Sequence, residues 1–248
     1  MTQLPGTPSD DMTAVLATGH GGIGTLFVSM ATRHPDGSDA DYLRWHTLDH
    51  RPEQHRLAAV RASLRLVSTP ACRSARAISR DRFDPIDHVM TYFFADPCGL
   101  DGFLELATAL GNAGRVRPLL PPVERGVYEV QSKASAPRIK VGADVLPWWP
   151  VRGVFLLVEQ GTAPLTGLLD TEGVAGVWSA SAMKVDSRLA NAHPGQSITY
   201  CFLDDDPVDT GARLQPVLAR RWHDTNVQPL LAAPFYPVVP HEWDRYVP

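Results

Sequence analysis

The residues of this sequence that are best suited to chemistry lie between Trp45 and Glu53, where two histidines and two carboxylates fall within a short segment. Residues three and four apart share one face of a helix, so the segment predicts a continuous stripe of aromatic and ionisable side chains. The stripe comprises Tyr42, Trp45, His46, Asp49, His50 and Glu53. So many ionisable groups do not suit a packing surface, and the pattern favours the wall of a pocket.

His50 is the strongest candidate for proton transfer, because the ordinary pKa of an imidazole lies near neutrality. Proline removes a backbone donor and clashes with the preceding turn, so Pro52 is expected to end or kink the helix. His50 would then lie in the last turn, near a pocket mouth. Asp49 or Glu53 is expected to orient the His50 ring or to raise its pKa. The alternative is that His50 is a solvated histidine beside acids.

The neighbouring side chains are assigned to binding. His46 is expected to line the pocket, and Tyr42 and Trp45 suit both core packing and a pocket lining. Arg51 is expected to face solvent, with binding of a substrate oxygen or carboxylate as the alternative. The spacing of His46 and His50 would also suit a metal ion, but the internal glutamate of an HExxH site is missing, and we expect no metal.

Length and composition limit the class of protein. The chain has 248 residues and a net charge of -4, and its scattered Arg and Lys residues give no reason to expect nucleic acid. The sequence has no signal peptide pattern and no apolar run of transmembrane length, so a soluble cytoplasmic protein without membrane association is expected. Cys72, Cys98 and Cys201 show no paired spacing, which argues against a zinc site and a disulfide framework.

The hydrophobic pattern predicts two runs of elements in the same order, β-α-β-β-α-β, which is that of a ferredoxin-like unit. After a loose arm over residues 1–22, the first run has strands at 24–31, 62–69, 88–95 and 126–132 and helices at 38–57 and 100–112. The second run has strands at 151–160, 176–183, 197–203 and 235–239, a short helix at 164–170 and a helix at 208–221.

Echoes of sequence indicate two copies of one unit. Residues 91–97 resemble 199–204, and residues 24–28 resemble 153–157. The second copy is shorter between these strands by about one helix, so the histidine-bearing helix has only a stub as its counterpart.

We therefore expect an α+β protein in which two tandem ferredoxin-like repeats form one barrel within the chain. The repeats cover residues 23–132 and 151–248, the second one ending in an aromatic tail, and a linker over 133–150 joins them. One site is expected in place of two. The protein is a pseudo-dimer within one chain on this prediction, with a homodimer as a further option.

Residues 42–53 are similar to the helix motif of EthD-like proteins in the dimeric α+β barrel superfamily, in which a tryptophan is followed by Tyr-Asp-x-x-His-x-Pro. The motif matches at Trp45, His50 and Pro52. His46 replaces the tyrosine and Thr47 the acid. The resemblance implies a barrel pocket beside the first helix, no organic cofactor, and a histidine acting as acid or base. The superfamily includes isomerases, cyclases, dehydratases, monooxygenases and haem-degrading enzymes, and fold alone does not select one of them.

We expect a cofactor-independent enzyme of isomerase or dehydratase and cyclase type, with His50 as proton shuttle and Asp49 or Glu53 as its orienting group. The expected substrate is a small, largely apolar, oxygenated molecule such as a ketone, a lactone or a polyketide-like ring. Its predicted contacts are Tyr42, Trp45, His46 and Arg51. The alternatives are a non-catalytic binding protein and a monooxygenase or haem-binding relative.

Overall fold

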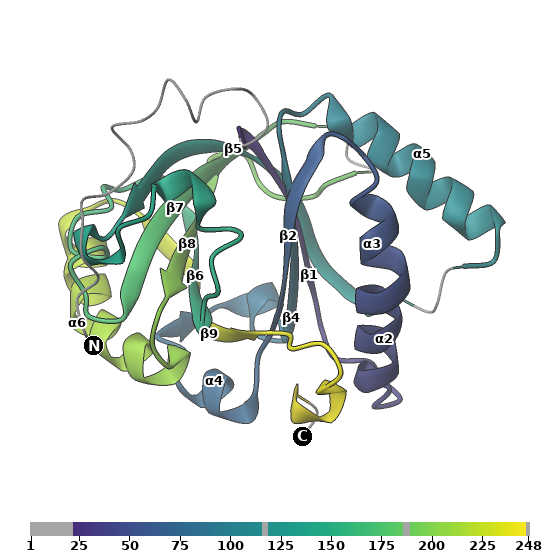
Figure 1. The fold of residues 1–248 in the computed structure, drawn as a ribbon. Helices are drawn as coiled ribbons and strands as arrows, with labels where there is room; N and C mark the ends of the chain where they lie inside the picture. The colour runs from purple at the N-terminus through teal and green to yellow at the C-terminus, as the bar shows by residue number, and fades with distance from the viewer. Residues whose placement is uncertain (1–21, 116–118, 186–188, 247–248) are drawn as a thin grey trace.

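The computed structural model describes residues 22–115, 119–185 and 189–246, and eight antiparallel strands in these ranges close into a barrel (Figure 1). The barrel strands are β1 (Thr25–Ala31), β2 (Val60–Val67), β4 (His88–Phe94), β5 (Pro122–Ser135), β6 (Gly153–Gln160), β7 (Val174–Ala182), β8 (Gln196–Leu203) and β9 (Gln228–Pro237). A short strand, β3 (Ile78–Ser79), also pairs with β9.

The barrel closes through a short pairing in which Leu66 and Val67 of β2 lie opposite Pro237 and Tyr236 of β9. Around the ring the strand order is β2-β4-β1-β5-β7-β8-β6-β9. Each half therefore places its strands in the same order, namely its second, third, first and fourth. Closure at this seam therefore rests on two residue pairs, while β2 pairs with β4 along its whole length.

Side chains fill the interior of the barrel, because alternate residues of every strand point inward. The largest of them are Phe93, Tyr128, Trp178, Tyr200, Phe202 and Phe235. Phe93 and Trp178 meet edge to face with ring centroids 5.9 Å apart. The residues predicted for chemistry lie outside this packed ring, so the expected site within the barrel is corrected to its outer face.

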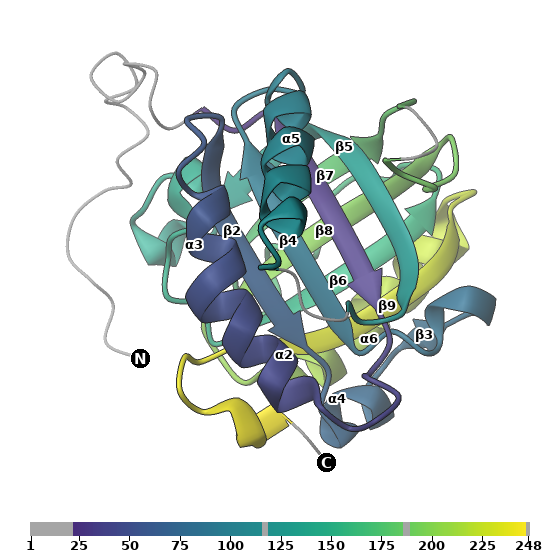
Figure 2. The same ribbon diagram turned by 90° about the vertical axis from the view of Figure 1, so that its right-hand side faces the viewer.

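Helices cover that outer face. The chain from Asp39 to Gln54 forms one continuous helical rod of three segments, α2 (Asp39–Trp45), the π-helix η2 (His46–His50) and α3 (Arg51–Gln54). The rod and α5 (Gly99–Asn112) lie over β2 and β4 (Figure 2), and Phe103 of α5 packs against Phe27 of β1, while α6 (Pro207–Asp224) packs on the second half. The shorter helices are α4 (Pro70–Ser74), η3 (Asp81–Phe83), η4 (Pro137–Ile139), η5 (Ala143–Val145) and η6 (Trp243–Tyr246). Within the ranges that the structure describes, no helix has the length and apolar character needed to cross a membrane.

Three predicted elements need correction. The helix expected at 164–170 is a series of turns, and Gly167 and Gly173 adopt positive φ angles of 82° and 92° that a helix does not contain. The last strand begins at Gln228, earlier than expected. The predicted linker begins as strand, because β5 runs on to Ser135 and pairs with β7. The predicted N-terminal arm lies, apart from Gly22, outside the described residues.

The sequence similarity between the two halves is out of step with their structures by one residue. Tyr92 and Tyr200 align in the echo, but Tyr92 faces the helices and Tyr200 faces the barrel interior. Leu26 and Phe155 align in the same way and also lie on opposite faces. A shift of one residue exchanges the two faces of a strand. The aligned letters are therefore not equivalent positions, although the order of the strands recurs.

Candidate functional site

The predicted stripe forms on a helix that widens before Pro52. The backbone N–H of Arg51 donates to the carbonyl of His46, five residues earlier, as in a π-helix. In an α-helix the proline ring would clash with the carbonyl four residues before it, and the wider turn relieves that clash. The helix therefore continues to Gln54 instead of ending at Pro52, and the prediction that His50 lies in the last turn is wrong.

The π turn brings together rings that are five residues apart. The ring centroids of Trp45 and His50 lie 5.0 Å apart, and those of His46 and His50 lie 5.5 Å apart. Tyr42 stacks on His46 at 5.7 Å. Four rings thus line one side of the rod, as the spacing predicts, and this side faces the outer surface of the sheet.

The two carboxylates of the stripe bind Arg115 instead of His50. Arg115 Nη2 donates to Asp49 Oδ1 at 3.0 Å, and its Nη1 donates to Glu53 Oε1 at 3.2 Å. The structure describes Asp49, His50 and Glu53, and no hydrogen bond joins either carboxylate to the His50 ring. The expectation that Asp49 or Glu53 orients His50 is therefore wrong. Trp45 Nε1 donates to the Arg115 carbonyl at 3.1 Å, so this contact fastens the rod to the segment after α5.

His50 is a half-buried, neutral imidazole. Gln54 Nε2 donates to His50 Nε2 over 3.5 Å, which places the proton of a neutral ring on Nδ1. That Nδ1 is buried and has no hydrogen-bond partner in the described part of the chain. Burial lowers the pKa of His50, and the charge of Asp49 acts in the opposite direction, as expected, without overcoming it.

His46 lies deeper, 4% exposed, between the rod and β4. Its Nε2 is 3.5 Å from the Tyr92 hydroxyl, and its buried Nδ1 has no partner among the residues described. Burial lowers the pKa of His46 well below its ordinary value, and the nearby Arg65 charge adds to this effect. Burial raises the pKa of Tyr92. Both groups are therefore neutral near pH 7, and each can donate or accept a hydrogen bond.

Sequence reasoning missed a chain of buried polar residues under the rod. His88 Nε2 donates to Asp39 Oδ1 at 2.6 Å, and Arg65 Nη2 donates to His88 Nδ1 at 3.3 Å. The Arg65 guanidinium also lies over the Tyr42 ring, 4.9 Å from its centroid. Burial lowers the pKa of His88 to about 4, so this ring is neutral. The available signal was the presence of Arg65 and His88 at outward positions of strands that a helix covers.

Arg51 is half-buried, which corrects the expectation that it faces solvent. Burial lowers the pKa of its guanidinium. Its charge acts on the Tyr92 hydroxyl and the His46 ring, and the Arg65 charge acts on the same two groups. Arg51 is thus the second cation beside the imidazoles.

Within the described ranges, no three or more His, Cys, Asp or Glu side chains form a group that could hold a metal ion. The rings of His46 and His50 are tilted by 48° to each other, and no third ligand joins them in the described part of the chain.

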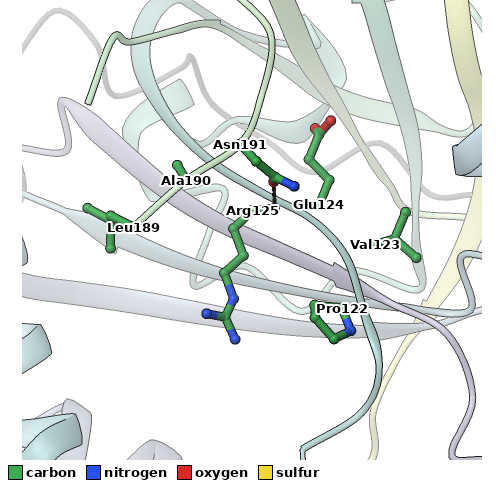
Figure 3. A pocket seen from close by; sticks show the side chains of 7 residues that line it. All are labelled: Pro122, Val123, Glu124, Arg125, Leu189, Ala190 and Asn191. Atoms are coloured by element: carbon green, nitrogen blue, oxygen red, sulfur yellow. Dashed lines mark hydrogen bonds between the residues drawn. The ribbon is translucent and has the colours of Figure 1, made fainter. Parts of the chain in front are cut away.

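A cavity of about 200 Å³ lies away from the rod, between the start of β5 and residues 189–191 (Figure 3). Its lining residues are Pro122, Val123, Glu124, Arg125, Leu189, Ala190 and Asn191. The Glu124 and Arg125 side chains point to opposite sides of the strand. Inside the barrel, the Glu124 carboxylate pairs with Arg82 and accepts from Gln196 Nε2 at 2.6 Å. This carboxylate is fully engaged in closing the barrel end, and none of the predicted site residues reaches the cavity.

Neither a protein-family model nor a curated protein matches the sequence. Solved structures match along most of the chain. A dye-decolorizing peroxidase from Bacteroides thetaiotaomicron VPI-5482 is 10% identical with a TM-score of 0.53, over 91% of this chain and 94% of that one. A putative chlorite dismutase, TA0507, is 12% identical with a TM-score of 0.48, over 91% and 100% of the two chains. An anthrone oxidase-like protein is 10% identical with a TM-score of 0.47, over 87% and 91%.

At such low identity the likeness to the peroxidase shows the fold alone. The fold is an α+β fold, an antiparallel eight-stranded barrel with few helices. The likeness selects neither the EthD-like family nor a reaction, and both stay predictions.

Proposed function

We propose that the layer between the rod and strands β2 and β4 is the active site of an acid or base enzyme. The supporting observation is a concentration of buried polar atoms that have no hydrogen-bond partner among the described residues. Five of these atoms lie on the rod or on the strand beneath it: His46 Nδ1, Thr47 Oγ1, His50 Nδ1, Gln54 Oε1 and Arg65 Nε. Each such atom costs about 1–3 kcal/mol when it is left unpaired, so their concentration favours a ligand that satisfies them.

His50 is the proton shuttle of this proposal. Its neutral ring takes a proton from a carbon next to a carbonyl and returns one to the product, as an isomerase or a dehydratase or cyclase requires. The Tyr92 hydroxyl stays protonated because burial raises its pKa, so it can donate a hydrogen bond to the oxygen on which charge develops. Tyr42 and Trp45 provide the apolar wall, and Arg51 contacts the substrate. No organic cofactor has a role in this reaction.

Asp49 and Glu53 serve this site indirectly. Their bonds to Arg115 hold the π turn against the segment after α5, and this keeps the His50 ring at a fixed height above the sheet. We therefore assign them as positioning residues in place of the catalytic role that the sequence predicts.

We further infer that residues 23–132 and 151–248 are two ferredoxin-like units, because each half repeats one strand order. The second half has turns where the first has the rod, since residues 161–173 contain no helix. This difference supports a single active site in each chain.

The test is hydrogen exchange in deuterated water with a panel of cyclic ketones and lactones, followed by NMR. The wild-type protein is expected to exchange the proton next to the carbonyl of at least one substrate, and His50→Gln is expected to lose this activity while keeping its fold. His223→Gln is the matched control, because His223 is an exposed histidine on α6. An unchanged rate in His50→Gln would remove His50 from the mechanism. A Soret band in the purified protein would instead favour the haem-binding alternative.

A further inference from the structure

Arg65 is a buried guanidinium that has no anionic partner among the residues that the structure describes. The residue is 4% exposed, and its Nη2 donates to the neutral His88 ring. Its Nε is buried and has no hydrogen-bond partner in the described ranges. Its guanidinium also lies over the face of Tyr42, and a cation over an aromatic ring gains far less than one paired with a carboxylate.

Arg51 adds a second positive charge to the same place. The two guanidinium groups repel each other, and both act on His46 and Tyr92. Arg51 donates to no carboxylate in the part of the chain that the structure describes, and neither does Arg65.

The acidic groups around the rod are already engaged. Asp39 accepts from His88 and from the backbone of His34, and Asp49 and Glu53 bind Arg115. Burying like charges without a counterion is costly, and among the described residues neither the buried Arg65 nor the half-buried Arg51 has a carboxylate partner.

We propose that the substrate of this site carries a carboxylate, which binds between Arg51 and Arg65. A guanidinium presents donors in a planar fork that matches the two oxygens of a carboxylate, and the Tyr92 hydroxyl can add a third hydrogen bond. The inference rests on the proposed function, because it names the substrate class of the same site.

A carboxylate fits this site better than a phosphate does. Phosphate sites commonly use the backbone N–H groups at a helix N-terminus. The first turn of α2 carries Asp39 and Asp41, whose negative charges repel a second anion there. The rings of Tyr42, Trp45 and His50 contact one another in turn, and the Arg65 guanidinium lies over the Tyr42 ring, so an aromatic wall begins at this cation and suits a planar organic acid.

The test is isothermal titration of the full chain with benzoate, with benzamide as a neutral molecule of the same shape and with inorganic phosphate. Benzoate is expected to bind about tenfold tighter than benzamide or phosphate, a difference that one charge-assisted contact supplies. Arg51→Met, which keeps the length of the stem and removes the charge, is expected to lose this preference. Arg44→Met is the matched control, because Arg44 lies exposed on the same rod. Equal benzoate binding by the wild type and Arg51→Met would overturn the proposal, as would tighter binding of phosphate.

Thermal unfolding without ligand is the second measurement. Arg51→Met is expected to melt at or above the wild-type temperature, because the substitution relieves repulsion between two buried cations. A clear loss of stability would show that a group within the protein already balances the Arg51 charge, and would refute the inference. If benzoate binding depends on Arg51 while no hydrogen exchange of a ketone or lactone depends on His50, that result would refute proton transfer by His50 and would still support the carboxylate site. Exchange without such binding would refute the carboxylate site alone.

Discussion

The free energy of unfolding is expected to fall already in mild acid, at pH values above those at which carboxylates titrate. His88 accounts for a defined part of this decrease. The ring is fully buried, donates from Nε2 to Asp39 and accepts at Nδ1 from Arg65. Protonation would place a second positive charge at Nδ1, directly against the guanidinium. Burial accordingly lowers the pKa of His88 from 6.5 to about 4.

The sign and the size follow from these two values. Between pH 6.5 and pH 4 the unfolded chain binds a proton at His88 that the folded chain does not bind. The stability from the neutral ring is therefore fully present above pH 6.5 and is lost as the pH falls toward 4. At pH 5 the loss at this ring amounts to about 2 kcal/mol, and the whole shift corresponds to about 3.4 kcal/mol.

The assay is urea unfolding of the wild type and of His88→Gln, each at pH 7 and pH 5. Glutamine keeps one donor for Asp39 and one acceptor for Arg65 but does not titrate. The variant is expected to be less stable at pH 7, and the gap from the wild type is expected to shrink by about 2 kcal/mol at pH 5. His223→Gln, which changes an exposed histidine, is the control for the replacement itself. A gap for His88→Gln that stays constant or widens in acid would refute the reasoning.

Two further predictions concern the rest of the fold. Glu159→Ala leaves the buried Arg221 without its ion pair and is expected to cost about 3–5 kcal/mol by chemical denaturation, whereas Arg213→Ala breaks a partly exposed pair and should cost less than about 1 kcal/mol. Similar decreases in unfolding free energy in the two variants would contradict the view that the Glu159–Arg221 pair is buried and the Arg213–Asp205 pair is partly exposed. Iodoacetamide is expected to label one thiol per native chain, at Cys98, because the other two cysteines are buried; mass spectrometry that finds all three labelled in native protein would contradict the packing.

The strands were predictable because each alternates between a filled interior and a covered outer face, and that alternation is written in the sequence. Predicted strands at 24–31 and 197–203 agree with β1 and β8 to within about one residue. The end or kink expected at Pro52 takes the form of a π turn just before it, which accommodates a proline that a regular α-helix excludes. Local preference could not reveal that turn.

The site was predictable only in part, because some of its contacts join residues that lie far apart in the sequence. Spacing within the rod is enough to bring Tyr42, Trp45, His46 and His50 into contact. The partners of the rod come from remote segments: Arg115 follows α5, and His88 belongs to β4. The pairing of a helix with a residue on another element depends on packing and register, which a pattern of residue types does not specify. The true partner of Asp49 was therefore missed, and so was the cation beneath Tyr42.

The strand register gives an independent reason to expect one site per chain. The outward position of Tyr92 puts its hydroxyl beside His46. Tyr200, which aligns with it in sequence, points inward and shares a hydrogen bond of 2.6 Å with Thr91 in the middle of the barrel. A helix added over the second half would therefore meet no tyrosine at the corresponding position, since the outward residues on either side of Tyr200 are Thr199 and Cys201. Restoring the missing helix would not restore a second site, because the shift of one residue has already moved the hydroxyl to the other face of the sheet.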